Sequence, residues 1–297
     1  MDEASGTGST NHGWEPIPLY YDAVFRWVFG SEQHKHVLGK FLKAAMPDVP
    51  AEEWASLTLP NTHVLRPGQK EVVLDVLAIT AQRRIAVEMQ MRWDDGIRQR
   101  FTFSNSTQVV DQLNPGDSYL ELLPVVTLVV CGFVLIWEDR TYKHTFTDYD
   151  QENKVRFTSL RELRTLELPK LHDDDGSELW DWMRLIAAPT KEEIDMVVAG
   201  NPDLREAADL VKEFSADEAR RYAARAHEKF LHDQATREDC ARRRGLAQGR
   251  EEGRQEGRQE GRREAIQRLA AQGMPVAQVA DIFAMASDEV EAIINAR

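Results

Sequence analysis

Residues 70–91, KEVVLDVLAITAQRRIAVEMQM, decide the fold of this chain. Two runs rich in β-branched and apolar residues are separated by the polar AQRR, a pattern typical of two strands joined by a tight turn. If the hairpin turns between positions 81 and 82, opposed residues have numbers that sum to 163, so Asp75 lies opposite Glu88. Gln90, two residues further along its strand, shares their face. The sequence therefore predicts three polar side chains together on one face of an apolar hairpin.

Asp75 and Glu88 are the groups of this hairpin that can carry chemistry. Directly opposed residues have Cβ atoms about 4.5–5.5 Å apart. Two carboxylates at that distance repel each other unless a cation neutralises them or one of them holds a proton. Mg²⁺ is held by carboxylates, waters and substrate phosphate, so the pair suits phosphodiester hydrolysis. The alternative is that both carboxylates lie at strand ends and pair with arginines, namely Arg83, Arg84, Arg92 or Arg98.

The elements around the hairpin follow from periodicity and turn residues. Apolar residues in 20–46 predict two short helices broken near Gly30, and 94–113 predict a helix closed by Asn-Pro-Gly. The apolar run within 122–136 is too short for a membrane span and predicts a buried strand. From about residue 166 the pattern turns helical. The order is helix, strand, strand, helix, strand.

LDV followed by VEMQ, within this order of elements, resembles the PD-(D/E)XK nuclease superfamily, in the branch of the Rpn recombination-promoting nucleases and transposases. The resemblance spans about residues 18–265. It implies an α/β fold, a mixed sheet flanked by helices, followed by an all-helical C-terminal extension. Further matching motifs are YDAVFRWVFG, Arg100, Gln112-Leu113, Gly116, Tyr119, Leu123-Pro124-Val125, the helix SADEARRYAARAHEKF and the glycine-spaced tail.

The resemblance also implies roles for individual residues. Asp75 and Glu88 are the expected metal ligands, for Mg²⁺ or Mn²⁺, and Gln90 stands in the place of the motif's lysine. Neutral Gln90 can orient a group through its amide but supplies no positive charge. Asp22 matches an early acidic position and is either a third carboxylate or a helix-start residue favoured by the dipole. Arg100 completes the expected catalytic set.

Two neighbouring cations have alternative interpretations. Arg26 stands where relatives often have lysine, and it either approaches phosphate or pairs with Asp22. Lys70 can substitute for the missing lysine charge from a neighbouring strand. Arg98, Ser104, Gln108 and Asp111 form a polar stripe on the following helix, which faces either the site or solvent.

The sequence thus predicts a metal-dependent DNA endonuclease associated with recombination or mobile elements. The alternative is a nuclease-like fold that has lost cleavage and serves as a DNA-binding or oligomerisation module. The net charge of −13 excludes a general nucleic-acid coat protein, because phosphate binding draws on Lys and Arg. Binding to DNA is therefore expected to be weak, salt-sensitive and dependent on the metal.

The basic charge is concentrated in residues 241–263, which contain eight Arg and four Glu, a net charge of +4. Glycine recurs there every four residues, which costs about 1 kcal/mol per glycine in a helix. The stretch is either one member of a close-packed helix pair, giving a homodimer, or a flexible basic tether. Residues 264–297 resemble a helix-turn-helix, but their net charge of −3 favours a helical packing unit over a DNA reader.

The polar N-terminus lacks a signal peptide pattern, and two cysteines cannot form a disulfide framework, so a cytoplasmic protein without a membrane anchor is expected. The domain boundaries predicted from these patterns are a disordered N-terminus at 1–17, a nuclease-like core at 18–165, a helical region at 166–240, a Gly/Arg/Glu-rich helical repeat at 241–263 and a helix-turn-helix-like tail at 264–297.

Overall fold

A computed structural model describes residues 14–60, 63–64 and 72–295. Lys70 and most of the N-terminal stretch assigned to a disordered lead-in lie outside the described residues. Trp14, at the end of that stretch, packs against the core, and Ile17 is buried. The chain divides into two compact units, of which the first ends at Glu228 and the second begins at Lys229.

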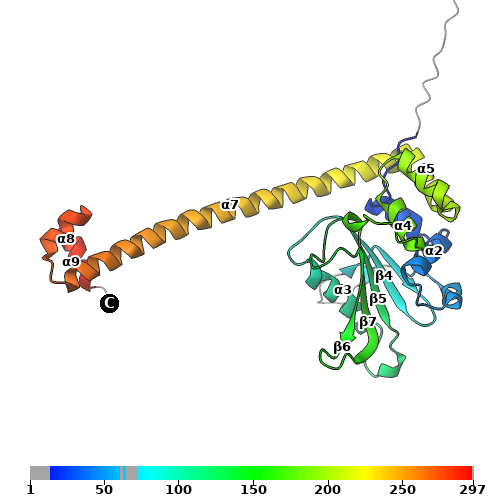
Figure 1. Cartoon of the computed structure of the whole chain (residues 1–297), viewed down its shortest axis with the longest axis horizontal. Helices are drawn as coiled ribbons and strands as arrows, with labels where there is room; N and C mark the ends of the chain where they lie inside the picture. The colour runs from blue at the N-terminus through cyan, green and yellow to red at the C-terminus, as the bar shows by residue number, and fades with distance from the viewer. Residues whose placement is uncertain (1–13, 61–62, 65–71, 296–297) are drawn as a thin grey trace, which may run out of the picture. The chain divides into compact units, whose positions relative to one another are not determined.

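Three groups of elements build the structure (Figure 1). The strands are β1 His63–Val64, β2 Val72–Val73, β3 Val76–Ile79, β4 Arg84–Gln90, β5 Val125–Cys131, β6 Lys143–Tyr149 and β7 Arg156–Glu167. The α-helices are α1 Asp22–Phe29, α2 Lys35–Ala45, α3 Ile97–Val110, α4 Glu178–Ala187, α5 Lys191–Gly200, α6 Arg205–Ala216, α7 Glu218–Ala271, α8 Val276–Phe283 and α9 Ser287–Asn295. The short 3₁₀ helices are η1 Ala51–Ser56, η2 Tyr119–Glu121, η3 Leu168–Lys170 and η4 Pro202–Leu204.

The main sheet has five strands in the order β3-β4-β5-β7-β6. β4, β5 and β7 are parallel neighbours, and β3 and β6 are antiparallel to their partners. Gln90, Cys131 and Glu167 are aligned at the carboxyl ends of the three parallel strands. In open α/β sheets this edge is where ligands bind, at a point where the strand order reverses. The mixed α/β fold predicted from the sequence is confirmed.

The β3–β4 hairpin has the register that its sequence predicts. Val76 pairs with Val87 and Ile79 with Arg84, so paired numbers sum to 163. The Thr80 amide donates to the Arg83 carbonyl at 2.9 Å and closes a two-residue turn. The buried carboxylate of Glu53 accepts from Thr80 Oγ1 at 2.6 Å and from Arg83 Nε at 2.6 Å. This buried ion pair fixes the turn and with it the register of the hairpin.

Helices cover both faces of the sheet (Figure 1). Ile85, Val87 and Met89 belong to the main core together with residues of α1, α2 and α4. The alternate residues of the parallel strands face α3, where Val129 and Cys131 pack with Phe101. The alternation places Glu88 and Gln90 on the α3 face, because neighbouring residues of a strand point to opposite sides.

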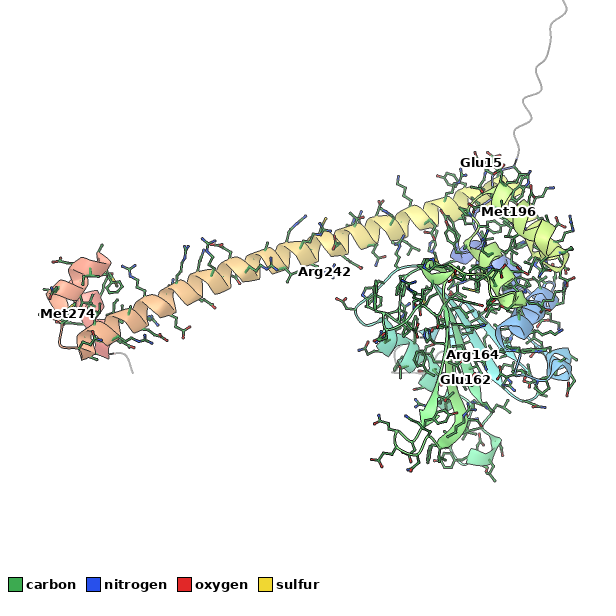
Figure 2. The ribbon with its side chains drawn as sticks, in the orientation of Figure 1. Glu15, Glu162, Arg164, Met196, Arg242 and Met274 are labelled. Carbon is green, nitrogen blue, oxygen red and sulfur yellow. The ribbon has the colours of Figure 1, made fainter. Side chains whose placement is uncertain are left out.

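β6 and β7 were not predicted from the sequence. β7 contains leucines at three-residue spacing and five charged residues, a pattern that favours a helix over a strand. The structure neutralises its arginines in place: Arg164 bonds Asp48 at 2.7 Å and Glu162 at 2.5 Å (Figure 2), and Arg161 bonds Asp148 at 2.8 Å. Tertiary ion pairing therefore overrides the local pattern.

A buried ion pair holds the loop that follows β5. Glu167 is fully buried and accepts from the Leu135 amide at 2.7 Å. Lys170, 6% exposed, contacts the Glu167 carboxylate at 3.3 Å and donates to the Ile136 carbonyl at 2.5 Å. Burial, with the nearby charge of Glu167, raises the pKa of the Cys131 thiol to about 12. The thiol is therefore unreactive at neutral pH.

Asp175 ties β6 to the start of α4. Its carboxylate accepts from Tyr142 Oη at 2.9 Å and Lys143 Nζ at 3.0 Å. Burial alone would raise the pKa of Asp175, but hydrogen bonds from Ser177, Lys143 and Tyr142 outweigh it and lower the pKa to about 2. The charged form is thus favoured in the folded state, which adds stability above pH 4 that is lost as the pH falls toward 2.

We expect Asp175→Asn to lower the free energy of unfolding by about 1 kcal/mol at pH 7, a value reduced for the partial exposure of the side chain. The difference from the native chain should shrink as the pH falls from 4 toward 2, because protonation then removes the same interactions. Urea unfolding at pH 7 and near pH 3 measures both values, with Asp173→Asn as the control. An equal difference at both pH values would contradict the assignment.

The second unit contains a small core of its own. Ile266, Val279, Ala280 and Val290 are buried together where the end of α7, α8 and α9 pack. Residues 264–297, which resemble a helix-turn-helix in sequence, thus comprise the end of the long α7 followed by two short helices. The glycines at 245, 249, 253, 257 and 261 lie within α7, and a Cβ built on any of them would have nothing within 4 Å in the described chain. Arg242, on the same helix, is labelled in Figure 2.

None of the described helices is both long and apolar enough to cross a membrane.

Candidate active site at the carboxyl edge of the sheet

The structure brings Asp75 and Glu88 together as the hairpin register predicts. Asp75 directly precedes β3, between the buried Leu74 and Val76, and its side chain is 11% exposed. Asp75 Oδ2 accepts from the Met89 amide at 2.9 Å, which places this carboxylate beside the backbone that follows Glu88. The carboxylates thus share one end of the hairpin.

Glu88 lies under α3, in a partly buried position on β4. Ser104 Oγ, on α3, donates to Glu88 Oε1 at 3.4 Å. Burial, followed by the negative charge of Asp75, raises the pKa of Glu88 to about 8, although Arg100, Ser104 and Arg26 act in the opposite direction. A raised pKa of this kind favours the protonated form of Glu88 at neutral pH, chiefly because the carboxylate is removed from water.

The amide of Gln90 is bonded at both of its ends. Arg100, one α3 turn before Ser104, donates through its guanidinium to Gln90 Oε1. Gln90 Nε2 donates to the Arg92 carbonyl at 2.7 Å. Since a side-chain amide has two N–H groups and two oxygen lone pairs, one of each remains available. Gln90 thus holds a guanidinium next to the carboxylates, although it has no charge itself.

α1 supplies the third carboxylate and a cation. Arg26 donates to Asp75 Oδ1 at 2.7 Å, so it pairs with Asp75 and not with Asp22, which was one of its expected partners. Burial raises the pKa of Asp22, and the negative charge of Asp75 raises it further, while Arg26 lowers it. Asp22 is therefore close enough to Asp75 for the two charges to interact.

The first turns of α7 also reach this region, which the sequence analysis missed. His227 Nε2 lies 3.9 Å from Asp22 Oδ2, and Glu228 Oε2 lies 3.7 Å from the Arg92 guanidinium. About two hundred residues separate His227 from Asp22 in the sequence, and no motif links them. Only the packing of α7 in the first unit, where Arg220 stacks on Trp27 at 3.8 Å, brings them together.

Gly132 allows the chain to leave β5 close to the site. Its amide donates to the Gln90 carbonyl at 2.9 Å. A Cβ at this position would lie 2.5 Å from Met91 Cε and 3.1 Å from Met91 Cα. A larger residue here would push the β5 loop away from the strand that carries Gln90.

The arginines proposed as ordinary salt-bridge partners of Asp75 and Glu88 are engaged elsewhere. Arg83 bonds Glu53, Arg92 pairs with Glu228, and Arg98 donates to the Leu135 carbonyl at 2.6 Å. Arg84, at the opposite end of β4, has its pKa lowered by burial and raised by the charge of Asp111. The four arginines thus have other partners or electrostatic neighbours.

The donor set fits a hard divalent cation. Asp75 and Glu88 offer only carboxylate oxygens, the ligands that Mg²⁺ and Mn²⁺ accept, and burial together with the charge of Asp75 makes the ionised form of Glu88 costly without a cation. Among the described residues, no three His, Cys, Asp or Glu side chains form a ready-made metal cluster.

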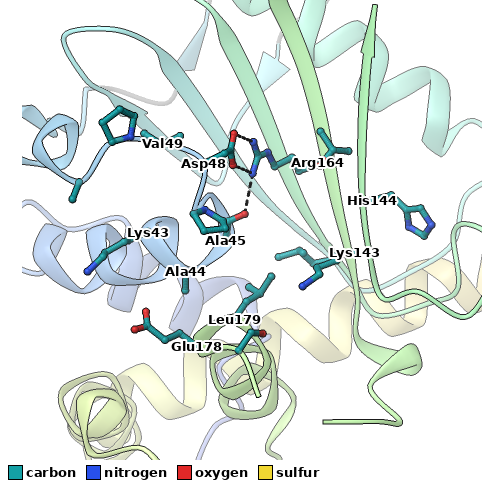
Figure 3. Close-up of a pocket in the computed structure, with 16 residues that line it drawn as sticks. Lys43, Ala44, Ala45, Asp48, Val49, Lys143, His144, Arg164, Glu178 and Leu179 are labelled. Atoms are coloured by element: carbon teal, nitrogen blue, oxygen red, sulfur yellow. Dashed lines mark hydrogen bonds and ion pairs between the residues drawn. The ribbon is translucent and has the colours of Figure 1, made fainter. Parts of the chain in front are cut away.

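A separate pocket of about 790 Å³ lies against α2, β6, β7 and α4 (Figure 3). Lys43, Lys143 and Arg164 contribute cations to its wall, and Arg164 is neutralised there by Asp48. None of the predicted catalytic residues lines it. The pocket lies on the α2 side of the sheet, whereas Glu88 and Gln90 lie on the α3 side, so it is distinct from the candidate site.

Comparison with known proteins identifies the family. A family model described as PD-(D/E)XK nuclease family transposase matches residues 19–241. No curated protein and no solved structure matched the chain in the parallel searches. The matched span covers three-quarters of the chain, including the main sheet, α1, α3 and the N-terminal part of α7. The chain belongs to the PD-(D/E)XK nuclease family transposases.

Proposed function

We propose that this chain is a divalent-metal-dependent DNA endonuclease. The observation that carries the proposal is the pair of carboxylates, Asp75 and Glu88, at the carboxyl edge of the sheet, with the pKa of Glu88 raised to about 8. A buried negative site of this kind stabilises a cation, and the family association with nucleases supports DNA as the partner.

Asp75 and Glu88 would hold Mg²⁺ or Mn²⁺. When bound, the cation would polarise the scissile phosphate and lower the pKa of the attacking water. Glu88 must lose its proton to serve as a ligand, and Ser104 orients its carboxylate. Arg26 keeps Asp75 in place through the contact at 2.7 Å.

Gln90 and Arg100 together replace the lysine that the motif usually has. Arg100 offers positive charge to the phosphate, and Gln90 fixes the guanidinium while its remaining N–H and lone pair can orient water. Asp22 adds negative charge on the other side of Asp75 and is proposed as an assisting carboxylate.

Cleavage of supercoiled plasmid in Mg²⁺ tests the proposal. The native chain is expected to produce nicked circles with Mg²⁺ or Mn²⁺ and none with EDTA, because without the cation the scissile phosphate is not polarised and the pKa of the attacking water is not lowered. Asp75→Ala should lose this product, whereas Glu121→Gln, an exposed carboxylate on η2, should retain it. Nicking that continues undiminished in Asp75→Ala would refute the assignment.

A second candidate function follows from Gln90. Since its amide is tied to Arg100 and the Arg92 carbonyl, the chain can instead be a nuclease-like DNA-binding module without cleavage. A chain that shifts DNA in a salt-dependent way but never nicks it, at any Mn²⁺ concentration, would favour this function.

Two further proposals come from the sequence. The first is a role in recombination or in mobile elements. The second is a cytoplasmic location, which suits a protein whose Cys131 and Cys240 are both free thiols. The homodimer through the C-terminal helices stays a prediction. Removing residues 245–297 and measuring the mass in solution tests that arrangement.

A further inference from the structure

The two edge strands of the main sheet, β3 and β6, differ in length and in what pairs with their outer sides. β3 has only four residues, and Thr58 bridges it on the outer side through two backbone hydrogen bonds with Ile79, each 2.9 Å. β6 has seven residues, and no strand or bridge in the described part of the chain pairs with its outer side. An edge strand of this length without proline offers a row of backbone groups to another strand.

The irregularity in the β6–β7 pairing lies in β7, and β6 itself stays regular. The pairing numbers change from Thr147–Glu162 to Asp148–Thr158, so the extra residues of the irregularity belong to β7. A bulge in the edge strand itself would disturb pairing on the outside, but this bulge is on the inner neighbour. The outer side of β6 therefore keeps the alternation of a straight strand from Lys143 to Tyr149.

The sequence of β6, KHTFTDY, is self-complementary about Phe146. In an antiparallel pair of two β6 strands centred there, Phe146 faces its own copy and Thr145 faces Thr147. His144 faces Asp148, and Lys143 faces Tyr149. Aromatic pairs and Thr–Thr pairs are cross-strand neighbours that stabilise antiparallel sheets, each by about 0.2–1 kcal/mol.

The side chains at the centre and end of this strand are exposed enough to make such contacts. Phe146 is 42% exposed and Tyr149 is 53% exposed. The side chain of Lys143 is 48% exposed. Its ammonium group lies over the Tyr142 ring and donates to the Asp175 carboxylate, but it remains accessible to solvent. A partner with the same sequence would cover an aromatic side chain and meet no like charge opposite.

We propose that β6 pairs antiparallel with β6 of a second copy of this chain, about a two-fold axis at Phe146, joining two five-stranded sheets into one. The partner is a second copy because the centre of the strand complements itself, in the Phe146 pair and the Thr145–Thr147 pairs, as an isologous interface requires. The interface is small, so association in the micromolar range is expected.

Light scattering on the full chain during size-exclusion chromatography tests the pairing. At tens of micromolar the native chain should have the mass of a dimer, and Phe146→Lys should have the mass of a monomer, since two like charges then meet at the axis. Met196→Lys adds the same charge at a 64% exposed apolar side chain of α5, a helix that packs on α4 and α6, and should remain a dimer. A native monomer throughout this range, or a Phe146→Lys dimer, overturns the proposal.

Disulfide trapping gives a second measurement that does not depend on the folding of Phe146→Lys. In a Cys240→Ser background, Phe146→Cys should form a covalent dimer on mild oxidation, because the two thiols meet on the axis. Met196→Cys, on α5, in the same background should form far less. Equal trapping at both positions overturns the pairing, and would direct attention to another interface such as the C-terminal helices.

Discussion

Replacing Glu88 with glutamine is expected to abolish DNA cleavage and at the same time to stabilise the metal-free protein above neutral pH. The pKa of Glu88 is raised to about 8, chiefly by burial and then by Asp75, whereas the unfolded chain has an ordinary glutamate. A raised carboxyl pKa stabilises the fold at low pH, and this stabilisation is lost as the pH rises from about 4.5 to 8. Glutamine mimics the protonated form at every pH.

We therefore expect Glu88→Gln to raise the free energy of unfolding at pH 9 by on the order of 2 kcal/mol, with little effect at pH 4. Cleavage should fall by about 100-fold or more, because one of two anionic ligands is lost. Urea unfolding in EDTA at both pH values, and plasmid nicking in Mg²⁺, measure the two effects. Adding Mg²⁺ should stabilise the native chain and leave Glu88→Gln unchanged.

Glu121→Gln provides the control for removing one carboxylate, since Glu121 is exposed on η2. It should leave nicking and the pH dependence of stability unaltered. A Glu88→Gln protein that is less stable than the native chain at pH 9 would show that neighbouring cations and hydrogen-bond donors fully stabilise the charged carboxylate in the fold. Full nicking by the same protein would remove Glu88 from the metal site.

Replacing Arg100 with methionine is expected to reduce cleavage by about 100-fold, the scale of losing one electrostatic contact to a transition state. Arg100 bonds the oxygen of Gln90, and the proposal assigns to this guanidinium the positive charge that lysine supplies in the usual motif. Arg100→Lys should retain part of the activity, because it keeps the charge but loses the planar donor geometry.

Gln90→Lys placed in the Arg100→Met background makes the test specific, because it returns a positive charge to the site from β4. Cleavage should recover by tenfold or more over Arg100→Met alone, in a double-mutant cycle measured on the same plasmid. Arg140→Met, which removes an exposed arginine from a loop, is the matched control. Failure of Gln90→Lys to improve Arg100→Met, with both proteins folded, would show that Arg100 acts by positioning Gln90 and not by its charge.

The hairpin could be predicted from sequence because its information is local. The alternation and the AQRR turn set the register, and the register alone placed Asp75 beside Glu88. The helical spans of α1, α2 and α3 followed from apolar periodicity and from glycine or proline near their ends. Each of these patterns is complete within about twenty residues.

The unpredicted parts depend on partners far away in the chain. β7 needs Asp48 and Asp148 to neutralise its arginines, so its local pattern resembles a helix until the fold is known. Arg26 pairs with Asp75 across 49 residues, and His227 approaches Asp22 only after α7 packs. The family resemblance supplied the acidic position at Asp22 but neither of these contacts.

The two cysteines differ so strongly in environment that the native chain has one practical attachment point. Cys131 is buried in β5 with its pKa raised to about 12, whereas Cys240 is exposed on α7. Maleimide chemistry requires a thiolate that the reagent can reach. A fluorophore or spin label will therefore attach to α7 alone, without any substitution, and can report how that helix responds when DNA or a metal ion is added.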